Sequence, residues 1–98
     1  MTSRSTIEKK LSQTVADLQR AREEIRILDE QIAYSADTAE DARLRSMVSE
    51  TPLAEREHRG AARAVAALHR DRSVWVERVA KLERTQDDLL DQLIVELS

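Results

Sequence analysis

Hydrophobic residues recur along nearly the whole chain at alternating steps of four and three. This period of 3.5 residues is typical of helices that pack along their length in a coiled coil. The first half reads Ile7, Leu11, Thr14, Leu18, Ala21, Ile25, Leu28, Ile32, Ser35, Ala39, Ala42, and the second reads Ala61, Val65, Leu68, Arg72, Trp75, Val79, Leu82, Gln86, Leu89, Leu93. The pattern predicts two long helices and an all-α fold.

The segment between the two halves carries the signals of a chain reversal. Pro52 has no N–H group and clashes with a preceding helical turn, so the first helix is expected to stop before it. Thr51 suits the N-cap of a second helix, Pro52 its first position, and Glu55 its first turn. We therefore predict one domain over 1–98, with helices at about 5–48 and 52–97 and a turn at 49–51.

The two hydrophobic patterns also agree with each other in phase. In an antiparallel pair, residues that face each other have numbers with a constant sum, and here the sum is 100, as for Ile25 and Trp75. Half of that sum falls beside the predicted turn. We expect a long antiparallel coiled-coil hairpin, and we call its facing positions the seam. Its predicted apolar residues are Ile7, Leu11, Leu18, Ala21, Ile25, Leu28, Ile32, Val65, Leu68, Trp75, Val79, Leu82, Leu89 and Leu93.

Two places weaken this picture of uninterrupted helices. Asp37 and Glu40 have the spacing of a capping box, so the alternative to a continuous first helix is a break at 35–38 and a short extra helix at about 38–48. Gly60 costs about 1 kcal/mol relative to alanine inside a helix. Both places fall in the half of the hairpin nearer the turn.

Polar residues interrupt the seam at four positions, namely Thr14, Ser35, Arg72 and Gln86. Arg72 either fixes the register or extends past Leu28 toward Asp29 or solvent, and we favour the second interpretation. Thr14 faces Gln86, and the two side chains either bond to each other as a register marker or do not.

Some hydrophobic residues lie beside the seam and not in it. They are Val15, Val76, Leu90, Ile94 and Leu97. Extra apolar surface on a helix usually packs against another helix. We therefore predict a homodimer that forms a four-helix bundle, the alternative being a monomer with an exposed apolar end.

Composition narrows the function classes. The 98 residues contain 16 Lys and Arg, 19 Asp and Glu, a net charge of −3, one Gly, one Pro and no Cys. These values disfavour a strongly cationic nucleic-acid coat, a disulfide and a thiolate metal site. The polar first residues and short apolar runs are expected of a cytoplasmic chain with no membrane contact.

Candidate chemistry is sparse. Glu55 and His58 form the Glu-x-x-His half-motif of di-iron bundles, but the expected carboxylate partner on the first helix is missing, and His69 lies too far from His58 to share a metal. No catalytic triad spacing or phosphate loop is present, and a two-helix rod is expected to offer no pocket. We predict no enzyme activity and no cofactor.

The function expected from these features is a non-enzymatic interaction or scaffold module that binds itself and a protein partner. The first alternative is a regulator that docks a basic tip on nucleic acid, a ribosome or RNA polymerase. That tip comprises Arg56, Arg59, Arg63 and Arg70. The second alternative is a metal-binding bundle that uses Glu55 and His58.

Overall fold

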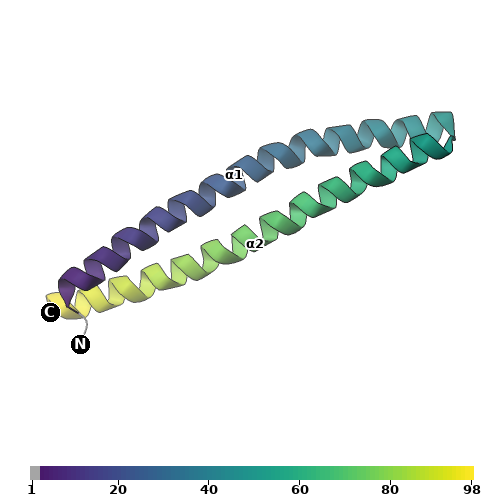
Figure 1. Ribbon diagram of the computed structural model, residues 1–98. Helices are drawn as coiled ribbons and strands as arrows, with labels where there is room; N and C mark the ends of the chain where they lie inside the picture. Colours follow the sequence, from purple (N-terminus) through teal and green to yellow (C-terminus); the bar gives the residue numbers. More distant parts are fainter. Residues whose placement is uncertain (1–2) are drawn as a thin grey trace. The chain divides into compact units, whose positions relative to one another are not determined.

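A computed structural model describes residues 3–98 and contains two α-helices joined by a short turn (Figure 1). Helix α1 spans Arg4–Ser49 and helix α2 spans Pro52–Leu97, and each has 46 residues. The chain is an all-α hairpin in which two long helices pack against each other. It divides into two compact units, a stem unit of Met1–Glu24 with Trp75–Ser98 and a tip unit of Ile25–Val74.

The turn consists of Glu50 and Thr51. The Thr51 hydroxyl accepts a hydrogen bond of 3.1 Å from the Ala54 N–H and so caps the start of α2. Glu50 has a positive φ of 50°, and its N–H donates to the Ser46 carbonyl at 3.1 Å. This left-handed residue ends α1. The reversal therefore uses the threonine cap and the proline that the sequence indicated.

Helix α1 is continuous through 35–38, so the expectation of a break with a short extra helix over 38–48 is wrong. A capping box would need the Glu40 carboxylate to bond back to the backbone at residue 37. Instead, Arg43 donates to both carboxylate oxygens of Glu40, at 2.6 and 3.0 Å. The Thr38 hydroxyl donates to the Tyr34 carbonyl at 3.2 Å, which is compatible with an unbroken helix.

Burial follows the heptad on both helices. In the stem unit, each buried or half-buried seam residue of α1 matches one of α2 whose number completes a sum of 100, and the seam of the tip unit obeys the same rule. Val15, Asp17, Glu24, Ile27 and Gly60 are half-buried beside the seam. The stem positions are 7, 11, 14, 18 and 21 on α1 with 79, 82, 86, 89 and 93 on α2. The tip positions are 28, 32, 35, 39, 42 and 46 on α1 with 54, 58, 61, 65, 68 and 72 on α2. Ile25 and Trp75 are both half-buried, so all the predicted apolar seam residues are at least half-buried.

The two units differ in the size of the side chains they bury. The largest fully buried side chains, Ile7 and Leu18, both belong to the stem unit. In the tip unit, the seam of α1 continues through small residues, among them Ser35, Ala39 and Ala42. The stem unit therefore buries more apolar surface per layer than the tip unit does.

Gly60 lies inside α2, and a Cβ atom added there would meet nothing within 4 Å. Replacing Gly60 with alanine is therefore expected to raise the free energy of unfolding by about 1 kcal/mol, because alanine loses less backbone entropy in a helix. Chemical denaturation monitored by circular dichroism measures the change. The matched control is Ala67→Gly, one heptad later on α2 at an exposed position, which should lose a similar amount. A loss of stability in Gly60→Ala would contradict this account.

Candidate functional site

One side of the stem unit carries the apolar residues that lie beside the seam. We call Val15, Val76, Leu90, Ile94 and Leu97 the apolar flank. Val15 is half-buried, whereas the four residues on α2 are 42%, 40%, 62% and 57% exposed in that order. Large apolar side chains that remain this exposed in a group mark an interaction surface.

An ion pair across the two helices shows that these residues share one side of the stem unit. Arg22 donates to Glu83 at 3.4 Å. Val15 precedes Arg22 by seven residues on α1, and Leu90 follows Glu83 by seven on α2. Seven residues make close to two helical turns, so Val15 and Leu90 lie on the same side as the ion pair, and Val76 and Leu97 continue the row on α2.

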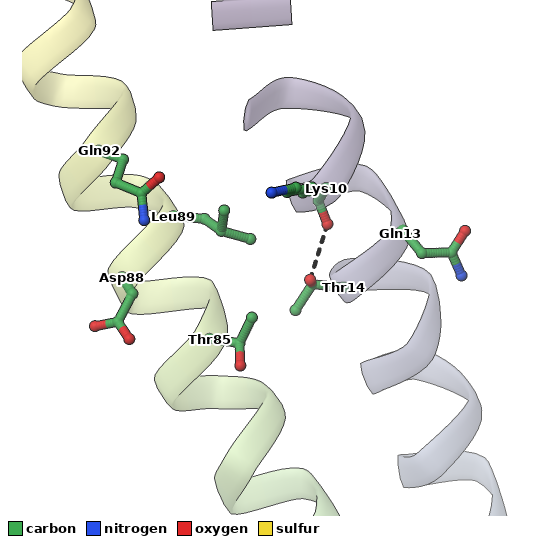
Figure 2. A pocket seen from close by; sticks show the side chains of 7 residues that line it. All are labelled: Lys10, Gln13, Thr14, Thr85, Asp88, Leu89 and Gln92. Atoms are coloured by element: carbon green, nitrogen blue, oxygen red, sulfur yellow. Dashed lines mark hydrogen bonds between the residues drawn. The ribbon is translucent and has the colours of Figure 1, made fainter. Parts of the chain in front are cut away.

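The opposite side of the stem unit is polar and contains a shallow hollow of about 430 Å³. Figure 2 shows Leu89 directed from α2 toward Thr14 of α1, whereas Gln13 points away from α2. The seven lining residues are Lys10, Gln13, Thr14, Thr85, Asp88, Leu89 and Gln92. The hollow arises where Thr14, which is smaller than the neighbouring seam leucines, occupies the seam.

A second open hollow, of about 500 Å³, lies in the tip unit between Glu30, Gln31, Tyr34, Ser35 and Leu68. Both hollows are open to solvent, so neither is an enclosed pocket. Each hollow has the same origin, because a small polar seam residue, Thr14 or Ser35, leaves space beside it.

The polar seam residues are satisfied locally. The Arg72 guanidinium donates to Asp29 at 2.6 Å, which confirms the interpretation that it extends toward that carboxylate. The Thr14 hydroxyl donates to the Lys10 carbonyl of its own helix at 2.8 Å (Figure 2). The Thr14 hydroxyl therefore does not donate a hydrogen bond to Gln86. Within residues 3–98, no buried side-chain nitrogen or oxygen lacks a partner.

The outward face of α2 in the tip unit is cationic. Arg56, Arg63 and Arg70 are spaced seven residues apart on the side opposite the seam, and Arg59 lies beside them. We call these four exposed residues the arginine stripe. None of them has an ion pair with any residue between 3 and 98, and one exposed carboxylate, Glu57, lies between Arg56 and Arg59.

The outward face of α1 in the tip unit has the opposite charge. Its carboxylates, which we call the acidic face, are Glu30, Asp37, Glu40 and Asp41, all exposed. Arg26 pairs with Glu30 at 2.7 Å. The hydrogen bond from Arg43 to Glu40 holds the pKa of that carboxyl below its ordinary value and raises the pKa of Arg43. Asp37 and Asp41 have no ion pair with the described residues.

Metal and membrane chemistry find little support. Glu55 is exposed and His58 is half-buried in the seam, and His69 is exposed. Across residues 3–98, no group of three or more His, Asp or Glu side chains is placed to hold a metal ion. In the same range, neither helix contains an apolar stretch long enough to cross a bilayer.

Sequence reasoning missed the acidic face and a set of exposed hydrophobic residues in the tip unit. Tyr34, which lies off the seam, is 76% exposed. The others are Leu44, Met47, Val48, Leu53 and Val74, which are 48–86% exposed. The sequence contained the signal for both sets of residues, because the heptad that defines the seam also defines the positions that point away from the seam.

Comparison with known proteins adds no relative: no protein family matches the chain, and no curated protein or solved structure is significantly similar to it.

Proposed function

We propose that this chain is a non-enzymatic coiled-coil module that associates with itself through the apolar flank of the stem unit and, as a dimer, serves as a scaffold for a protein partner. The observation that carries the proposal is the group of four large side chains on one side of α2, each 40–62% exposed. A second copy is a fitting occupant because the flank is uncharged at these positions and both copies gain equally from covering it.

The asymmetry between the two sides of the stem unit supports this choice. On the side of the flank, the heptad positions of α2 next to the seam are Val76, Glu83, Leu90 and Leu97, and Glu83 is held by Arg22. On the other side, the equivalent positions of α2 are Arg78, Thr85 and Gln92. At these positions next to the seam, apolar residues are thus confined to one side, as expected of helices that pack into a four-helix bundle on that side.

The self-association is expected to be weak. Covering a Val, Leu or Ile that is about half exposed contributes roughly 1 kcal/mol. Four such residues in each of two copies give about 8 kcal/mol before the cost of association, which is itself 4–15 kcal/mol. We therefore expect a dissociable dimer whose population rises with protein concentration, and not an obligate one.

Salt is expected to strengthen this contact. Asp87 lies among the flank residues on α2 and has no ion pair with the described residues. Two copies packed through the flank bring their Asp87 carboxylates nearer to each other. Salt screens that repulsion and does not weaken the apolar contact.

The test is the double variant Leu90→Glu/Ile94→Glu, which is expected to be a monomer of about 11.2 kDa while the natural chain approaches twice that mass at high concentration. The reason is that two carboxylates placed on the flank would have to be desolvated in the dimer. Light scattering coupled to size-exclusion chromatography measures the mass, and circular dichroism checks that the helices remain.

The matched control is Gln92→Glu/Val95→Glu, which adds the same two charges to the same end of α2 away from the flank. Gln92 lines the polar hollow, and Val95 is 73% exposed. This control should dimerise like the natural chain. An identical mass for the natural chain and Leu90→Glu/Ile94→Glu at every concentration would refute the flank as the interface.

A further inference from the structure

We propose that the tip unit carries a second self-interaction surface, in which the arginine stripe on α2 of one copy docks on the acidic face of α1 of another copy. This contact uses none of the residues of the apolar flank. It goes beyond the proposed function because it joins two different faces of the tip unit. A contact between two different faces leaves one of each free on the outer copies, so further copies can add side by side.

The spacing of the charges matches on the two faces. Arg63 and Arg70 are seven residues apart on α2, and Glu30 and Asp37 are seven apart on α1. All four are exposed and lie opposite the seam, two residues from the nearest buried or half-buried seam positions on either side. Seven residues rise about 10 Å along a helix, so two matched charge pairs are possible only in certain registers.

The register that matches is the one already present within the tip unit. Glu30 and Arg70, and likewise Asp37 and Arg63, have numbers that add to 100, so each pair lies at one level of the hairpin on opposite outward faces. A second copy in the same orientation, moved sideways, therefore sets α1 against α2 with Glu30 beside Arg70 and Asp37 beside Arg63. Glu40 falls beside Arg59 within one residue of this register.

Available charges favour this contact over isolated hairpins. Asp37 and Arg63 each lack an ion pair with the described residues, so their pairing between copies breaks no bond within one copy. In the proposed register, no arginine meets an arginine and no carboxylate meets a carboxylate. The one cation among the outward positions of α1, Arg26, falls beside Val74, which has no charge.

The exposed hydrophobic residues of the tip unit fit the same register. Tyr34 is 76% exposed and lies between Glu30 and Asp37. The register sets it against Ala66 and Ala67, two exposed small residues between Arg63 and Arg70 that leave space for a ring. An aromatic ring in this place can also contact the guanidinium groups on either side. Val48, 86% exposed, comes within one residue of Leu53, 59% exposed.

The charge pattern therefore favours a second copy of this chain as the partner of the arginine stripe. An acidic partner of some other kind would satisfy the arginine stripe but would leave the acidic face and Tyr34 uncovered. A second copy covers both faces at once and repeats along the stack. We infer an open-ended side-by-side array that forms at low salt and high protein concentration.

Charge reversal on each face tests the inference. One variant carries Glu30→Lys/Asp37→Lys and the other carries Arg63→Glu/Arg70→Glu, both in the Leu90→Glu/Ile94→Glu background, which removes the flank contact. The parent should gain mass with concentration at about 0.01 M salt, where the screening length is about 30 Å, and lose the gain at about 1 M, where it is about 3 Å.

Each reversed variant alone should stay at the monomer mass, because both of its faces then carry the same sign. An equimolar mixture of the two should regain the association, because both faces of one variant are then positively charged and both faces of the other are negatively charged. Circular dichroism of each variant verifies that it is helical, and Arg78→Glu/Arg84→Glu, on α2 of the stem unit, is the matched control that should still associate.

Two results would overturn the inference. The first is an absence of association in the parent at low salt, or no recovery on mixing the reversed variants. The second is a parent that does not self-associate but binds a mixed-sequence DNA or RNA duplex, with this binding lost only in Arg63→Glu/Arg70→Glu. That result would mean that the arginine stripe binds phosphate groups. The flank is judged separately at about 1 M salt, where its contact persists, so failure of one proposal is distinguishable from failure of the other.

Discussion

Replacing Leu18 with alanine is expected to lower the free energy of unfolding by about 2–5 kcal/mol, a large share of the stability of a small domain. Leu18 is 1% exposed and is one of the two largest fully buried side chains. It shares its seam level with Leu82, which is half-buried. Truncation removes apolar contacts and leaves space that two rigid helices cannot close. Urea denaturation followed by circular dichroism gives the change.

The control for this prediction is Leu44→Ala on the same helix. Leu44 is 48% exposed on the outward face of the tip unit, so its loss should change the free energy of unfolding by about 0.5 kcal/mol or less in dilute solution. Equal losses at positions 18 and 44 would mean that the seam does not hold the stem unit together. The comparison therefore tests the burial pattern itself and not only the sensitivity of one residue.

The hairpin could be predicted from the sequence because its two determinants are local and strong. The alternation of steps of four and three fixes which side of each helix is buried, and Thr51 with Pro52 fixes where the chain reverses. The structure uses both, with a hydrogen bond from the Ala54 N–H to the Thr51 hydroxyl and α2 beginning at Pro52.

The continuity of α1 could not be decided from the same signals. Asp37 and Glu40 have the spacing of a cap, but a cap competes with other partners of the same side chains. Here Arg43, three residues after Glu40, donates hydrogen bonds to the Glu40 carboxylate. Only the arrangement of side chains decides such a competition, and the segment contains neither glycine nor proline to force a break.

The surfaces were predictable in part. The flank residues follow from apolar positions next to the seam, and the arginine stripe was recognised as a basic tip. The acidic face was missed because Asp37 and Glu40 were considered as helix-capping signals and Glu30 was not considered. Their common direction emerges only when each is placed relative to the seam. Hollows beside Thr14 and Ser35 also depend on side-chain volumes, which a pattern of polar and apolar letters does not contain.

Replacing Ala21 with aspartate is expected to destabilise the stem unit by about 3–5 kcal/mol at neutral pH, the usual cost of an uncompensated buried charge. Ala21 is 0% exposed, at the seam level of Val79. An aspartate side chain is short, so a carboxylate there would remain among apolar atoms. Ala16→Asp is the matched control, because Ala16 lies on the same helix but is exposed, and it should cost little.

The loss at position 21 should depend on pH in a defined direction. Burial disfavours the charged form, so the pKa of the new carboxyl in the folded chain is raised above its ordinary value of about 3.9. Folding then takes up a proton, and the deficit relative to the natural chain grows as pH rises from about 4 toward about 7. Melting temperatures of Ala21→Asp and the natural chain, compared at both pH values, measure the difference while the effects of other carboxyls cancel. A deficit that is the same at both pH values would mean that the aspartate reaches water and that position 21 is not enclosed by the two helices.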